Sequence, residues 1–198
     1  MSNCYSIVPR TMLIRTTGFN LYLILIAALL PGLGCRSPES KQKSAEKKIL
    51  STLRVHLEDR PDPMGRTETA EVYRASPVTF TIDKAPFLSE AFVKEAKVTD
   101  VMGGFALEVQ FDRQGSWLLE QYTSANRTKH LVIFSQFVNP GEEKINQGRW
   151  LAAPQISNHI TDGLLIFTPD ATRDEAKRIA LGLNHVAEKL STGKEPKF

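Results

Sequence analysis

Cysteine is scarce in this chain, and the spacings at which histidine and cysteine hold metals are missing. The 198 residues include two cysteines, Cys4 and Cys35, and four histidines. No histidine follows a histidine or a glutamate in a His-x-x-His or Glu-x-x-His pattern, so a metal site would have to be assembled from distant positions. We therefore expect neither a metal nor a cofactor.

Motifs of nucleophilic catalysis and phosphate binding are also missing. No Gly-x-Ser-x-Gly or Ser-x-x-Lys motif occurs in a strand-turn-helix context, and Gly103-Gly104 does not open a phosphate-binding loop. Asp170, Asp174 and Glu175 could perform acid–base chemistry, but acids are also favoured in the first turn of a helix. We expect a protein without enzymatic activity; a hydrolase-like enzyme with a site built from scattered residues is the alternative.

Long hydrophobic runs are absent too. The longest run near the N-terminus, Leu21–Leu30, has ten residues, whereas a helix needs about 20 apolar residues to cross a bilayer. Arg10 and Arg15 precede it, and basic residues before a short apolar core are typical of a secretory signal peptide. Met12 is an alternative start that would leave a more compact signal.

The end of this segment resembles the lipobox of bacterial lipoproteins, in which a cysteine is acylated and becomes the first residue of the mature chain. Gly34-Cys35 fits that pattern, whereas Gly32 occupies the position where the family usually has leucine. Cys4 would be removed with the signal, which leaves Cys35 unpaired. We expect a signal peptide over residues 1–34 and a lipid (palmitate) anchor on Cys35 that holds the protein to a membrane. An ordinary cleaved signal or an uncleaved anchor is the alternative.

The chain after Cys35 has no long stretch in which basic or acidic residues strongly predominate. Residues 36–48 carry a net charge of +3, and residues 49–198 contain 18 basic and 20 acidic residues, a net charge of −2. A mildly acidic body excludes the basic footprint of a nucleic-acid-binding protein. We interpret residues 35–48 as a flexible tether and residues 49–193 as a single domain.

The most regular pattern predicts a strand, a helix and a second strand between Phe105 and Phe134. Phe105–Phe111 alternates apolar and polar residues, as a half-buried strand does. Asp112 is placed to cap a helix with apolar residues at helical spacing. Leu131–Phe134 is a continuous apolar run, which is typical of a strand buried on both faces.

The flanking regions predict the remaining elements. Thr172 and Glu175 form a capping box that opens the clearest helix, which Gly193 ends. Ser89–Ala96 predicts one or two helical turns. Further strands are expected at residues 49–57, 71–83 (interrupted at Ser76-Pro77), 96–101, 150–156 and 164–167. The fold class expected is α+β, with a mostly antiparallel sheet of about six or seven strands and two main helices packed on one face.

Residues from about Pro86 to Asn184 resemble the periplasmic head subdomain of SecD, a protein-export subunit. The ordered features that carry the resemblance are Ala85-Pro-Phe-Leu-Ser-Glu90, Phe111-Asp112 followed by Gly115, Asn126 with Lys129 and Leu131-Val-Ile133, Trp150-Leu-Ala-Ala-Pro-Gln-Ile156, Phe167-Thr168, and Asp174-Glu175-Ala176. The glycine-rich segment that precedes Phe-Thr in the family is reduced here to Gly163. The resemblance implies a fold, an extracytoplasmic location and contact with exported polypeptide, and it implies no catalytic residue.

Aromatic side chains are the strongest candidates for a binding surface, because aromatics dominate protein interfaces. Of the four considered, Trp117, Tyr122, Phe137 and Trp150, at least two are expected in the core. We predict that Trp117 and Phe137 form the surface, and that the strand after Pro77 offers an open edge. The partners expected are an exported polypeptide, a translocon subunit or another envelope protein, on the extracytoplasmic (periplasmic) side of the cell envelope. A purely structural envelope protein is a further alternative.

Overall fold

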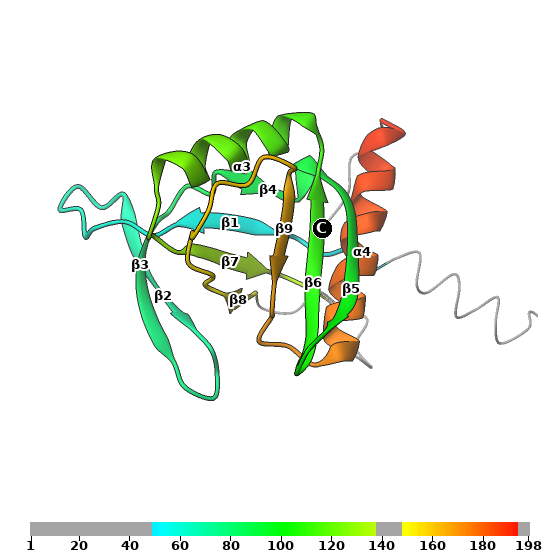
Figure 1. Ribbon diagram of the computed structural model, residues 1–198, viewed down its shortest axis with the longest axis horizontal. Coiled ribbons are helices and arrows are strands. Elements are labelled where there is room, and N and C mark those ends of the chain that lie inside the picture. Colours follow the sequence, from blue (N-terminus) through cyan, green and yellow to red (C-terminus); the bar gives the residue numbers. More distant parts are fainter. Residues whose placement is uncertain (1–48, 138–147, 194–198) are drawn as a thin grey trace, which may run out of the picture. The chain divides into compact units, whose positions relative to one another are not determined.

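The computed structural model describes residues 49–137 and 148–193, so the expected signal peptide, tether and Cys35 lie outside the described residues. Nine strands, a short 3₁₀ helix and two α-helices make up the described part (Figure 1). The strands are β1 (Arg54–Leu57), β2 (Thr67–Val72), β3 (Val78–Asp83), β4 (Leu88–Ser89), β5 (Val93–Val101), β6 (Gly104–Phe111), β7 (Leu131–Ser135), β8 (Arg149–Ala152) and β9 (Leu164–Phe167), and the helices are η1 (Glu90–Phe92), α3 (Arg113–Ala125) and α4 (Arg173–Ser191). Within these residues no helix combines the length and apolarity needed to cross a bilayer.

All strand pairs are antiparallel, and they form three sheets. The strand orders are β4-β1-β7-β8, β2-β3 and β5-β6-β9. The expected α+β class with mostly antiparallel sheet is therefore confirmed, although six or seven strands was too low a count. The two helices do not share one face: α4 packs chiefly on β5, whereas α3 contacts β4 and β6.

The predicted strand, helix and strand at the centre of the chain are β6, α3 and β7. Leu107, Val109 and Phe111 of β6 are buried while Glu108 and Gln110 between them are partly exposed, as the alternation predicted. The Asp112 side chain accepts a hydrogen bond from the Gly115 N–H at 2.7 Å and so caps α3.

Strand β7 is buried on both faces, as its unbroken apolar run predicted. Leu131 and Ile133 face the main core, which lies between the four-stranded sheet, the three-stranded sheet and the two helices. Val132 faces the opposite way, into a second cluster formed with the β2–β3 hairpin, whose members are Ala70, Val72, Ile82, Val132 and Ala153. The hairpin thus covers the outer face of the four-stranded sheet, because successive side chains of a strand point to opposite faces.

Helix α4 begins with the predicted capping box: the Thr172 side chain accepts from the Glu175 N–H, and Glu175 accepts from the Thr172 N–H. At Gly182 the helix touches the chain before β1, where an added Cβ would lie 2.7 Å from the Ser51 backbone nitrogen. Only glycine permits this approach, which seats the helix against Ser51.

Three expected boundaries differ in the structure. Only Glu90–Phe92 of the predicted helical turns is helical, and β5 begins at Val93, which pairs with Phe111. The expected first strand is shorter, Arg54–Leu57. The expected strand over residues 150–156 ends at Ala152, shortly before Pro154, which has no N–H to contribute to the ladder.

Candidate functional site

Trp117 lies on the solvent side of α3. The opposite side of the helix buries Gly115, Leu119 and Thr123, and an added Cβ at Gly115 would lie 2.8 Å from the Phe92 Cβ. This close approach fixes which side of α3 faces the core. The indole of Trp117 is consequently 61% exposed, which makes it the largest exposed aromatic side chain of the described part.

Phe137, the other predicted member of the surface, is a core residue. Its side chain is 4% exposed and packs in the main hydrophobic cluster, with the Arg149 guanidinium 5.1 Å from the ring centroid. The segment after β7 turns Phe137 inward, so the structure does not bring it together with Trp117 on a shared surface. Tyr122 and Trp150 are also partly covered, by Phe87 and by His56 with Phe134 respectively.

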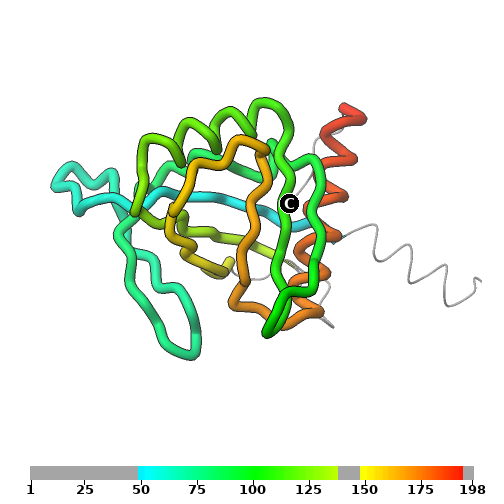
Figure 2. Tube along the Cα trace, in the orientation of Figure 1, coloured from blue at the N-terminus to red at the C-terminus, as the bar shows by residue number. Residues whose placement is uncertain are grey.

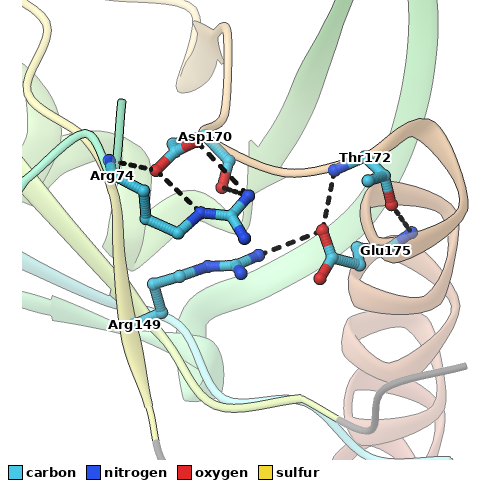
Figure 3. A network of polar contacts seen from close by, with 5 residues as sticks. All are labelled: Arg74, Arg149, Asp170, Thr172 and Glu175. Carbon is cyan, nitrogen blue, oxygen red and sulfur yellow. Dashed lines mark hydrogen bonds and ion pairs between the residues drawn. The ribbon is translucent and has the colours of Figure 1, made fainter. Parts of the chain in front are cut away.

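A polar network joins the end of the β2–β3 hairpin to the start of α4 (Figure 3). The Asp170 carboxylate accepts from the Arg74 backbone N–H at 2.8 Å and forms an ion pair with the Arg74 guanidinium at 3.2 Å. Next to it, Arg149 pairs with Glu175 of the capping box at 3.2 Å. Asp170 and Glu175 therefore serve a structural role, and Asp170 has a partner 96 residues away in sequence that no local pattern indicates.

The charge of Asp170 is stabilised by this network. Burial alone would raise the pKa of Asp170, but the hydrogen bonds from Arg74 and the positive charges of Arg74 and Arg149 outweigh burial and lower the pKa. A carboxyl with a lowered pKa in the folded state contributes stability above its unfolded pKa, near 4, and loses that contribution as the pH falls further.

We predict that Asp170→Asn lowers the free energy of unfolding by about 1 kcal/mol at pH 7. The difference from the wild-type protein should shrink below about pH 4, because the wild-type carboxylate then becomes protonated. Urea unfolding of both proteins at neutral and acidic pH measures this. A difference that stays constant down to pH 3 would contradict the assignment.

The predicted open edge at the strand after Pro77 is largely occupied. Residues that follow β1 run beside β3, where the Asp59 N–H donates to the Thr81 carbonyl at 2.9 Å. The His56 Nδ1 lies 2.8 Å from the Asp83 carbonyl oxygen. The outward backbone of β3 is thus bonded at two of its residues, and a partner strand cannot pair along its length.

The described residues contain no cluster of three or more His, Cys, Asp or Glu side chains that could hold a metal. Three histidines make defined contacts: His56 with Asp83, His130 with Glu58, and His185 with the Ile49 carbonyl. Burial lowers the pKa of His56. A pocket of about 240 Å³ opens between β9 and the segment at residues 154–160, and sequence analysis did not predict it.

Comparison with known protein families matches residues 67–187 to the SecDF P1 head subdomain. The match runs from β2 to α4, so it includes the β2–β3 hairpin, which the resemblance from Pro86 onward had left out. No curated protein matches the chain.

A solved SecDF structure shares this fold. A structure of SecDF in a super-membrane-facing form superposes with a TM-score of 0.50 at 18% identity, over 75% of this chain and 21% of that chain. A structure described as a membrane component SecDF that enhances protein export gives a TM-score of 0.49 at 20% identity, over 79% of this chain and 71% of that chain. This protein spans about a fifth of the former chain and most of the latter. Because the family match covers more than half of the sequence and nearly all of the described elements, the chain belongs to the SecDF P1 head subdomain family.

Proposed function

We propose that this protein is a non-enzymatic accessory module of protein export in the bacterial cell envelope. The observation that carries the proposal is the family match over residues 67–187, together with matched SecDF structures, one of which is described as enhancing protein export. In this proposal the head domain binds exported polypeptide or an envelope partner directly.

The proposal also includes a lipid anchor on Cys35 that holds the domain to a membrane, with residues 35–48 as tether and the domain on the extracytoplasmic side. A tethered domain meets its partner at a raised local concentration, so even a weak contact is effective. On this basis a Cys35→Ser chain is expected to carry no lipid, as its intact mass would show, while its domain stays folded.

Trp117 is the proposed contact residue, because an exposed tryptophan is a frequent energetic centre of an interface. The test is in-cell photocrosslinking from position 117, with the attached proteins identified by mass spectrometry. Position 177, an exposed lysine of α4, is the control. Several unrelated exported proteins or translocon subunits are expected at position 117 above that control.

Two results would change the proposal. If one envelope protein dominates the crosslinks, the domain is a dedicated partner module rather than an acceptor of many exported chains. If position 117 captures no more than position 177 does, Trp117 is not the contact residue and the proposed surface is wrong.

A further inference from the structure

The two edges of the three-stranded sheet differ in their hydrogen bonding. At the β5 edge, the Ala96 N–H donates to the Asn184 side-chain oxygen at 2.7 Å, and the Asn184 amide donates to the Ala96 carbonyl at 2.8 Å. The side-chain amide of α4 thus takes the place that a neighbouring strand would occupy. Helix α4 closes this edge to strand pairing.

The β9 edge is open at Ile166. The Phe111 N–H donates to the Gly163 carbonyl, and the register pairs Val109 with Leu165 and Leu107 with Phe167. In an antiparallel ladder every second residue bonds to the neighbouring strand, so Leu164 and Ile166 direct their backbone groups away from β6. The Leu164 N–H donates to the Asp162 side chain at 3.0 Å, whereas the Ile166 N–H and carbonyl have no hydrogen-bond partner among the described residues.

The pocket of about 240 Å³ lies directly beside this open edge. Leu165 and Ile166 line one side, and residues 154–160 line the other. In Figure 2 the chain runs from β8 up to α3 and returns as β9. Two hydrogen bonds hold this connecting segment in place. The Ile160 N–H donates to Thr123 Oγ1 at 3.0 Å, and the Ile156 N–H donates to the Lys129 carbonyl at 2.9 Å. The pocket is therefore bounded by anchored backbone on both sides.

We propose that one extended polypeptide segment adds to the β9 edge at Ile166 and places an apolar side chain in this pocket. An added strand needs only about 4.8 Å beside β9, and it would satisfy both free backbone groups of Ile166. Strand addition draws affinity from the main chain and selectivity from pockets for alternate side chains, and both components are present here. The Ile166 side chain, 49% exposed, supplies an apolar contact.

An unfolded segment of polypeptide fits this site better than a second folded copy of this chain does. Residues 154–160 wall the pocket on the side opposite β9, so an occupant enters between two backbone segments, which suits a single extended strand. The inference rests on the proposed function, because an exported polypeptide is extended and can offer such a segment. The edge of strand β2 is less suitable, because it carries the exposed side chains of Glu68 and Glu71, and charged side chains on an edge strand disfavour pairing with a further strand.

The experiment uses the purified full-length chain and a labelled peptide of alternating threonine and valine residues with lysine at each end. Fluorescence anisotropy measures binding, and amide hydrogen exchange reports where the peptide adds. Exchange at Ile166 should slow on peptide addition, while exchange at Thr69 on the β2 edge should not change.

Two changes isolate the backbone contact. Ile166→Pro removes the outward N–H together with the isoleucine side chain but keeps the hydrogen bonds of the ladder with β6, and binding should weaken about five-fold or more. Ile166→Thr retains that N–H and should bind within about two-fold of the wild-type chain. A peptide with alternate backbone nitrogens methylated keeps its side chains but should bind at least about ten-fold more weakly.

Three outcomes would overturn the inference. The methylated peptide could bind as well as the unmethylated one, or exchange at Thr69 could slow as much as exchange at Ile166. The protein could also form a dimer that Ile166→Pro dissociates, which would make a second copy the occupant.

Crosslinking separates this inference from the proposed function. Exported proteins that still crosslink at position 117 in the Ile166→Pro chain would preserve the function and reject this site. Peptide addition at Ile166 without any such crosslinks would preserve the site and reject the function.

Discussion

Phe137→Ala is expected to lower the free energy of unfolding by about 3–5 kcal/mol, the usual cost of removing a buried phenylalanine ring. The side chain is 4% exposed and belongs to the main core, so its loss leaves a cavity between neighbours that relax only partly. The Arg149 guanidinium, 5.1 Å from the ring centroid, would lose its aromatic contact as well.

Urea unfolding followed by tryptophan fluorescence measures this change, and Trp117→Ala, followed by circular dichroism, is the matched control. Trp117 is 61% exposed, and its removal should change the unfolding free energy by less than about 0.5 kcal/mol. If Phe137→Ala changes the unfolding free energy only slightly, Phe137 is again a candidate for the binding surface. A large effect at Trp117 would instead mark that residue as part of the core.

Gly163→Ala is expected to lower the unfolding free energy by about 2–5 kcal/mol, from two additive causes. Gly163 has a φ of +68°, a left-handed conformation that side chains other than that of glycine rarely adopt. An added Cβ would also overlap the Ser116 hydroxyl and lie 2.6 Å from the Ser116 Cβ. The single glycine before β9 thus allows the turn to pack against α3.

Thermal or urea unfolding of a double-mutant series separates the two causes. Adding Ser116→Gly to Gly163→Ala should recover the steric part and leave the backbone cost of about 1–2 kcal/mol. Gly104→Ala is the control, because an added Cβ there has no neighbour within 4 Å and no positive φ is recorded. Full stability of Gly163→Ala would show that the turn can take another form.

The sequence by itself determined the elements whose signals are local. Strand β6 follows from the alternation over Phe105–Phe111, and α3 follows from Asp112 at its start and a helical stripe after it. The capping box of Thr172 and Glu175 sets the start of α4. The sequence predicts these features correctly because each depends on residues that are close together in sequence, within one or two turns of a helix or a few residues of a strand. The ordered resemblance to the SecD head relied on the same elements and indicated the right family.

The tertiary structure alone decided which aromatic side chains are exposed and which strand edges are free to pair. Phe137 and Trp117 carry similar aromatic side chains, and only the turn after β7 sends the first into the core. The amide of Asn184 closes the β5 edge at Ala96, 88 residues away in sequence. The Arg74–Asp170 pair spans a similar separation. Such contacts arise when sheets and helices pack together, and because they join residues distant in sequence, neither periodicity nor propensity encodes them.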